Sequence, residues 1–321
     1  MKNKNLKLKQ SRLIYGTMGL GGGWNKNPIE KKDIVEAQIA IEAAVEVGIN
    51  FFDLANIYQY NKSEEVFGEY LKANPGFRDK VYLQSKVGII LATEERKAQF
   101  DFSYDHIIKE VAGSLKRLNT DYLDCLLLHR PDPLMEVKEV KAAVDYLFKN
   151  GMIKNIGVSN MGQHQIKHIA HYIERPIAAN QLELSLYKLE FASGGVLFNQ
   201  PGYKNIDFPI GTIEYCNRKG ISLQAWSPLA SGIYTGKQLD DNVPPSVIKT
   251  KELVASMAEE KGVTAEVIVL AWLMRHPALI SPVIGSKNPD RIRAVKGACE
   301  LELTRNEWYD LFITSRGEDM P

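Results

Sequence analysis

Short apolar runs of strand length recur along the chain, and most of them end abruptly at a polar residue. The runs span 13–17, 49–52, 81–85, 123–128, 156–158, 177–180, 221–225 and 279–285. Runs of this length indicate strands that are buried on both faces. Seven of them stop at side chains that can take part in chemistry: Asp53, Lys86, His129, Ser159 with Asn160, Gln181, Trp226, and Ser286 with Lys287.

Segments with apolar residues at helical spacing separate these runs. Helices are predicted over 34–47, 63–71, 104–118, 136–150, 163–173, 212–218, 251–261, 264–276 and 289–298, with an extra one over 304–313. Ser63 and Ser103 suit N-terminal caps, and Gly48, Gly151 and Gly220 suit the C-terminal ends. Strands that alternate with helices predict a parallel sheet with right-handed crossovers.

This alternation predicts a single (β/α)8 TIM barrel over 1–321, with an N-terminal hairpin and extra C-terminal helices. In such a barrel the carboxyl ends of all strands lie on one face, which carries the active site. The polar residues between 53 and 287 are therefore expected to meet in one pocket. Two long connections, 186–211 and 227–250, leave the same face, where long loops usually bind or cover ligands.

Composition limits the classes of function. The formal net charge of +1 gives no sign of a nucleic-acid partner, and no apolar stretch has the length of a membrane span. The lysine-rich start has no apolar core after it, so we expect no secretory leader, and the alternation at 6–9 predicts a short strand. Cys125, Cys216 and Cys299 are too widely spaced for a disulfide framework or a metal site, which fits a cytoplasmic protein.

Asp53, Tyr58, Lys86 and His129 are the candidate catalytic residues, three of them at strand ends. A phenol has a pKa of about 10, which is too high for an efficient acid at neutral pH. A nearby ammonium lowers that pKa, and a carboxylate can hold the ammonium in place. A histidine on the other side can hydrogen-bond to the phenol oxygen and help to relay a proton.

These residues lie in segments that resemble the aldo-keto reductases, most closely their bacterial members. GINFFDLANIY contains Asp53 and Tyr58, LQSK contains Lys86 and LLLHRPDP contains His129. The likeness continues through IGVSN, IAANQ and AWSPL in the same order over nearly the whole chain. It implies reduction of a small carbonyl substrate by NADPH, with Tyr58 as general acid. The resemblance also implies that Lys86 lowers the pKa of Tyr58 and pairs with Asp53, and that His129 orients the carbonyl or relays the proton.

The resemblance also implies a set of cofactor-binding residues. Ser159, Asn160 and Gln181 match residues that hold the nicotinamide carboxamide, and Trp226 matches the aromatic on which the ring stacks. Ser227, Pro228 and Leu229 match a segment along the pyrophosphate, and Ser286, Lys287 and Arg291 match the region around the 2′-phosphate. Thr17 and Met18, at the end of the first strand, complete the set.

Two features depart from the resembling family. Many members have Glu and Asn near the adenine where this chain has Ala294 and Val295, and Arg293 is the candidate substitute. The connection over 186–211 is long, so the substrate preference is not inherited. The physiological substrate, the reaction direction and the choice between a monomer and a small homo-oligomer remain open.

Several of these residues also fit a structural interpretation. Alone, Asp53 and Lys86 are more typical of a structural ion pair, but Tyr58 and His129 in the family's order favour catalysis. Ser286-Lys287 is also typical of a solvated turn. His164, His168 and His171 share one helix face without the glutamate of a zinc motif, which favours a solvated face.

Two glycine-containing segments resemble nucleotide-binding motifs but match neither. GLGGGW departs from the dinucleotide fingerprint at Trp24, and SGIYTGKQ departs from the P-loop at Ser231 and Gln238. A different class also stays open, a cofactor-sensing interaction subunit with little turnover on the same fold, because such subunits resemble the reductases at all four candidate catalytic residues.

Overall fold

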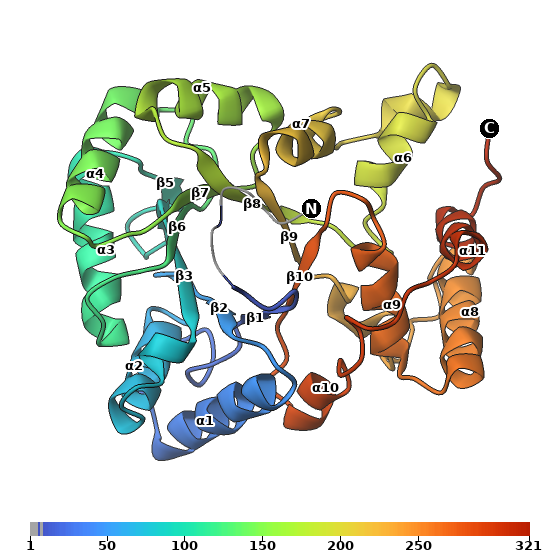
Figure 1. Ribbon diagram of the computed structural model, residues 1–321, viewed down its shortest axis with the longest axis horizontal. Coiled ribbons are helices and arrows are strands. Elements are labelled where there is room, and N and C mark those ends of the chain that lie inside the picture. The colour runs from blue at the N-terminus through green and yellow to red at the C-terminus, as the bar shows by residue number, and fades with distance from the viewer. Residues whose placement is uncertain (1–5, 7–8) are drawn as a thin grey trace.

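A closed barrel of eight parallel strands forms the centre of the computed structural model, which describes Leu6 and residues 9–321 (Figure 1). The strands follow one another around the barrel in chain order, and Ile14 of the first pairs with Val283 of the last to close it. The barrel strands are β1 (Ile14–Gly16), β2 (Phe51–Asp53), β3 (Tyr82–Val87), β6 (Cys125–Leu128), β7 (Ile156–Ser159), β8 (Ile177–Glu183), β9 (Ser222–Trp226) and β10 (Ser281–Ile284). The predicted (β/α)8 fold is confirmed.

Helices surround the barrel on its outside (Figure 1). They are α1 (Lys31–Glu46), α2 (Lys62–Ala73), α3 (Tyr104–Leu118), α4 (Val137–Lys149), α5 (Gln163–Ile173), α7 (Thr212–Lys219), α8 (Pro245–Lys261), α9 (Ala265–Met274), α10 (Pro289–Arg293) and α11 (Arg305–Arg316). The predicted strand at 6–9, and the hairpin to which it belongs, lie mostly outside the described residues. Leu6 itself is buried in a cluster with Cys125 and Leu127 of β6.

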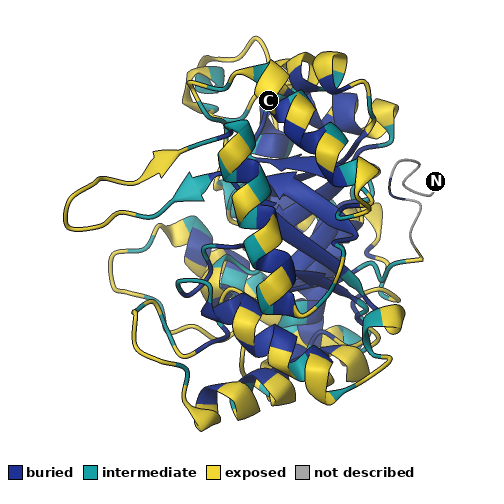
Figure 2. Ribbon diagram, turned by 90° about the vertical axis from the view of Figure 1, so that its left-hand side faces the viewer, coloured by how far each residue is buried: buried dark blue, intermediate teal, exposed yellow. Residues whose placement is uncertain are grey.

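The alternation of side chains along β3 shows how the strands serve two layers at once. Lys86 points into the barrel, where it bonds to Asp53, and Gln84 reaches across the barrel to Gln224 of β9. Ser85 points outward and donates to Glu64 of α2 at 2.6 Å. The main apolar core therefore lies between strands and helices, whereas the barrel interior around Gln84 and Lys86 carries polar groups. Figure 2 shows the barrel strands buried behind exposed helix faces.

Several elements differ from the sequence prediction. A short antiparallel hairpin, β4 (Ile89–Ile90) with β5 (Gln99–Phe100), extends from the barrel at the left of Figure 2. The long connection after β8 contains α6 (Glu190–Val196) and a 3₁₀ turn at Pro201–Asn205. The helix predicted over 289–298 ends at Arg293.

The predicted caps met different outcomes. Ser103 accepts a hydrogen bond from the backbone N–H of His106, so it caps α3 as predicted. Gly220 ends α7 in the left-handed conformation, also as predicted. Ser63 was the wrong cap for α2, because that helix begins at Lys62 after Asn61. The Ser63 hydroxyl instead donates to the carbonyl of Thr17 at 2.9 Å, which ties α2 to the segment after β1.

Candidate active site

A cavity of about 640 Å³ opens at the carboxyl ends of the barrel strands. Asp53 ends β2, His129 directly follows β6 and Ser159 ends β7, so parallel pairing brings residues from distant parts of the chain to one wall. The cavity is lined by most of the predicted site residues: Met18, Asp53, Tyr58, His129, Ser159, Asn160, Gln181, Trp226, Ser227, Pro228, Leu229, Ser286, Lys287 and Arg291.

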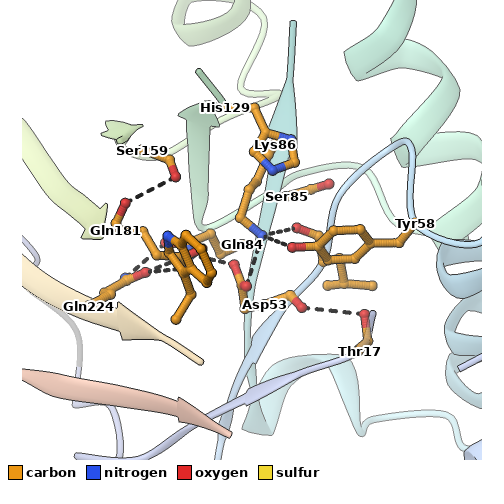
Figure 3. A network of polar contacts seen from close by, with 12 residues as sticks. Thr17, Asp53, Tyr58, Gln84, Ser85, Lys86, His129, Ser159, Gln181 and Gln224 are labelled. Atoms are coloured by element: carbon orange, nitrogen blue, oxygen red, sulfur yellow. Dashed lines mark hydrogen bonds and ion pairs between the residues drawn. The ribbon is translucent and has the colours of Figure 1, made fainter. Parts of the chain in front are cut away.

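The Lys86 ammonium lies behind the cavity wall and is fully buried. Its Nζ is 2.8 Å from Asp53 Oδ2, 2.8 Å from the carbonyl oxygen of Leu54 and 2.7 Å from Tyr58 Oη. These three partners match the three N–H bonds of an ammonium. Burial opposes the charge, but Asp53 and Tyr58 raise the pKa of Lys86 above its ordinary value. The group is therefore a fixed cation beside the phenol (Figure 3).

The phenol of Tyr58 combines two opposing influences. Burial raises the pKa of Tyr58 above its ordinary value, and the nearby Lys86 lowers it by a smaller amount. The lysine therefore acts in the direction predicted from the sequence, but the pKa as a whole moves the other way. A phenol in this state keeps its proton at neutral pH, and the ammonium stabilises the phenolate that would remain after the proton is transferred.

His129 packs edge-on against Tyr58, with 6.1 Å between the ring centroids. Burial, Lys86 and Arg130 hold the pKa of His129 well below its usual range, so the ring is neutral at neutral pH. Its buried Nδ1 has no hydrogen-bond partner among the described residues. A neutral imidazole can donate only one hydrogen bond, which suits orienting a carbonyl oxygen better than supplying the proton.

Four predicted carboxamide-site and stacking residues form one hydrogen-bonded cluster. Ser159 Oγ and the backbone N–H of Asn160 both donate to the backbone carbonyl oxygen of Gln181, at 3.0 and 2.9 Å. Asn160 Nδ2 donates to Ser159 Oγ, and Trp226 Nε1 donates to Asn160 Oδ1 at 3.0 Å. Asn160 has a φ of 57°, in the left-handed region that asparagine tolerates better than most residues. The cluster fixes the indole relative to the strand ends.

The segment after β9 is strained. Ser227, Ala230 and Ser231 have φ values of 51°, 44° and 56°, although none of them is glycine. Each such residue costs about 1–3 kcal/mol, and such strain gathers at ligand sites. Of the predicted ligand-contacting residues Ser227, Pro228 and Leu229, only Ser227 is among these strained positions, and their contact with a ligand stays a prediction.

Two predicted cations, Lys287 and Arg291, line the same cavity as Tyr58. Lys287 Nζ pairs with Glu36 of α1 at 3.0 Å, and more than half of its side chain is exposed. Arg291 lies against the strained segment, because a Cβ built on Gly232 would be 2.7 Å from its Nη2. Ser286 Oγ accepts from the backbone of Asn288 and helps to form the turn between them.

Two residues assigned from the sequence, Thr17 and Arg293, have side chains that do not line the cavity. Thr17 is fully buried with its hydroxyl 2.7 Å from Ser63 Oγ, so its side chain does not line the cavity, whereas Met18 does. Arg293 pairs with Glu46 at 2.9 Å and with Asp290 and is not among the residues that line the cavity. Val295 lines the cavity instead.

The sequence analysis missed several residues of the site. Trp24, Ile57, Ile89 and Arg130 line the cavity along with Tyr58 and His129. Arg130 had a signal, since it directly follows the strand-end histidine. Ile89 belongs to the hairpin that the sequence did not reveal.

Features outside the cavity have ordinary structural surroundings in the described part of the chain. Among the described residues, no group of three histidine, cysteine or acidic side chains has the arrangement of a metal site. His168 and His171 each pack edge-on against Tyr172. No helix in the described part of the chain has the length and apolar character to cross a membrane.

The aldo/keto reductase family model matches residues 12–312, and the chain therefore belongs to the aldo/keto reductase family. Its class of protein is the NAD(P)H-dependent oxidoreductases. The family assignment made from the sequence is thereby confirmed.

Individual relatives extend over nearly the whole chain. An oxidoreductase of Bacillus subtilis named YcsN is 34% identical over 98% of this chain and 97% of its own length. A 6-dehydroglucose reductase of Agrobacterium fabrum is 32% identical over 98% of this chain and 97% of its own length. The structure of a glycerol dehydrogenase from Gluconobacter oxydans covers 99% of this chain and 96% of its own, with a TM-score of 0.78 and 23% identity. At that identity the last likeness shows the fold alone.

Proposed function

We propose that this chain is an NADPH-dependent carbonyl reductase that converts an aldehyde or ketone to an alcohol, with Tyr58 as the general acid. The observation that carries the proposal is the 2.7 Å hydrogen bond from the buried Lys86 ammonium to Tyr58 Oη. The same ammonium donates to Asp53 Oδ2 at 2.8 Å, and Tyr58 lines the same cavity as His129. An ion pair with a purely structural role has no need of a phenol at the cavity wall.

The side chains along the cavity fit a nicotinamide dinucleotide with a 2′-phosphate. The cavity wall carries the cations Lys287 and Arg291, which suit a phosphate, and amide and hydroxyl groups beside Trp226. The reduced cofactor, when bound, supplies the hydride. The protein supplies the positions of the reactants and the proton.

The four candidate catalytic residues then have separate tasks, and together they form the tetrad Asp53, Tyr58, Lys86 and His129. Tyr58 donates its proton to the carbonyl oxygen, and Lys86 stabilises the phenolate left behind. Asp53 holds the ammonium in place through its carboxylate. The neutral His129 orients the carbonyl oxygen with a hydrogen bond from its ring. The apolar side chains of Trp24, Ile57 and Ile89 exclude water from this end of the cavity.

The direct test is steady-state consumption of NADPH and of NADH with a panel of carbonyl compounds. Hydroxylated aldehydes are the first members of that panel, because a relative is named 6-dehydroglucose reductase. Turnover with at least one aldehyde or ketone is expected. Tight NADPH binding with negligible turnover across the panel would instead support the cofactor-sensing interaction subunit.

Lys287→Ala is expected to weaken NADPH binding by about tenfold or more and NADH binding far less. A charge-assisted hydrogen bond to the 2′-phosphate is lost in the first case only, and such bonds are worth about 1.5–3 kcal/mol. Isothermal titration of both cofactors measures the difference. Arg293→Ala is the matched control, since this cation pairs with Glu46 away from the cavity. Equal weakening of both cofactors by Lys287→Ala, or a wild-type preference for NADH, would contradict the assignment.

Trp226→Ala is expected to remove much of the fluorescence quench that NADPH binding causes in the wild-type protein. The indole lines the cavity and is fixed by its hydrogen bond to Asn160, so a stacked nicotinamide lies within reach. Titration followed by intrinsic fluorescence measures the effect. A quench and an affinity that stay the same in the variant would assign the signal to Trp24, Trp272 or Trp308.

A further inference from the structure

Three buried glutamines from separate strands meet inside the barrel, beside the tetrad. Gln84 comes from β3, Gln181 from β8 and Gln224 from β9, and each is at most 2% exposed. Gln84 lies two residues before Lys86 on the same face of its strand. Figure 3 shows these three glutamines together with Asp53 and Ser159. Neither the tetrad nor the carboxamide site accounts for Gln84 and Gln224.

The amides form one continuous chain of hydrogen bonds. Gln84 Nε2 donates to Asp53 Oδ1 at 2.7 Å and to Gln224 Oε1 at 2.8 Å. Gln224 Nε2 donates back to Gln84 Oε1 at 3.0 Å, so these two amides form a reciprocal pair. Gln181 Nε2 then donates to Gln224 Oε1 at 3.0 Å. The chain runs from the tetrad carboxylate to the residue that matches the family's carboxamide contact.

The chemistry of Asp53 sets the direction of every amide in this chain. An ionised carboxylate only accepts hydrogen bonds, so Gln84 must present its NH₂ group to Asp53. The reciprocal pairing then turns Gln224 Oε1 toward Gln181, and Gln181 must answer with its own NH₂ group. The Oε1 atom of Gln181 takes no part in this chain of hydrogen bonds, so it is left for another partner. A flipped amide at any position places two donors or two acceptors face to face.

We propose that Gln84 and Gln224 are positioning residues that link Asp53 to Gln181. They thereby fix whether the oxygen or the NH₂ group of the Gln181 side chain contacts the cofactor. The inference rests on the proposed function, because it takes Gln181 as the carboxamide contact. It assigns the Gln181 Oε1 as an acceptor for the carboxamide NH₂ group. It also makes Gln84 the second donor to Asp53, beside Lys86.

A purely structural role is the competing explanation, and energetics argues against it. Buried amides lose their bonds to water, and apolar side chains of similar volume fill a core at no such cost. The rest of the barrel interior shows that alternative, since Cys125, Leu127 and Ala179 pack together there. A complete amide chain that ends at a ligand site has a use that a packing layer lacks.

Gln224→Met tests the link to the cofactor, because methionine keeps the volume and removes both bonding groups. We expect NADPH to bind about tenfold more weakly, the value of one to two lost hydrogen bonds. Adenosine 2′,5′-bisphosphate has the 2′-phosphate but no nicotinamide, so its affinity should stay within twofold of wild type. Cys125→Ala is the control, since Cys125 pairs in register with Gln84 but lies outside the amide chain. It should bind both ligands as the wild type does.

Gln84→Met tests the link to the tetrad. The substitution removes a hydrogen-bond donor from Asp53. The negative charge of Asp53 raises the pKa of Tyr58, and without this donor that charge is less well neutralised. The basic limb of the pH profile of kcat should move to higher pH in this variant and stay in place in Gln224→Met and Cys125→Ala. The double variant Gln84→Met with Gln224→Met should bind NADPH no more weakly than the weaker single variant, because both break one chain.

The possible results separate the inference from the proposed function. Normal NADPH affinity in Gln224→Met, or equal losses of NADPH and of adenosine 2′,5′-bisphosphate, would overturn the positioning role while wild-type turnover keeps the proposed function. If Cys125→Ala weakens NADPH binding as much as Gln224→Met does, the role of the three amides is merely structural. A wild-type protein that neither turns over a carbonyl nor binds NADPH more tightly than the bisphosphate would overturn both.

Discussion

Tyr58→Phe is expected to lower kcat for carbonyl reduction by about 10²–10⁴-fold, the usual contribution of general acid catalysis. The substitution removes the proton donor and keeps the ring, so its packing against His129 is retained. NADPH binding should stay close to normal, because Oη bonds to Lys86 and to none of the predicted cofactor residues. Loss of that one hydrogen bond should cost about 1.5–3 kcal/mol of stability, because its donor is a charged ammonium.

Single-turnover measurements with a good aldehyde, after the wild-type substrate is known, are the appropriate readout. They separate the chemical step from cofactor release. A Tyr58→Phe protein that reduces the aldehyde within about tenfold of wild type is short of the general-acid range. Tyr58 would then not be the acid, and the cofactor-sensing subunit would become the better explanation of the tetrad.

Lys86→Met is expected to impair both activity and stability. It removes the cation that stabilises the phenolate of Tyr58, so the rate should fall by about 10²-fold or more. It also leaves the Asp53 carboxylate buried with Gln84 as its remaining side-chain donor in the described site. Breaking a buried ion pair from one side costs about 3–5 kcal/mol. Urea unfolding measures the free energy, and NADPH oxidation measures the rate.

A double variant separates these two effects. Lys86→Met with Asp53→Asn removes the uncompensated carboxylate, so much of the lost stability should return. Activity should not return, because no cation faces Tyr58. Recovery of activity in the double variant would mean that Lys86 serves only to neutralise Asp53. A double variant no more stable than Lys86→Met would mean that the stability loss comes from packing.

The sequence was sufficient to predict the barrel and most of the cavity wall, for a physical reason. Parallel strands buried on both faces read as short apolar runs, and a polar residue at the end of such a run marks the one face where strands meet ligands. This pattern therefore predicts a common site for Asp53, His129, Ser159 and Trp226. They line one cavity, as that argument requires.

Elements with weak local patterns were missed. The strands Ile89–Ile90 and Gln99–Phe100 are two residues long and partly exposed, so no alternation marks them. The helix Glu190–Val196 contains Gly194 and Gly195, which are poor helix formers, and its contacts with the rest of the fold override that preference.

The sequence by itself determined the fold, the order of the strands and the face on which the chemistry lies, because these follow from local hydrophobic patterning. Only the tertiary structure decided how the polar groups pair across the barrel. Gln84 and Gln224 are 140 residues apart, and Lys287 is 251 residues from Glu36. It also decided the direction of the Tyr58 pKa, because the sequence identifies the lysine that lowers it but not the burial that raises it by more. Burial and long-range pairing belong to the folded chain as a whole, and no segment of the sequence carries them alone.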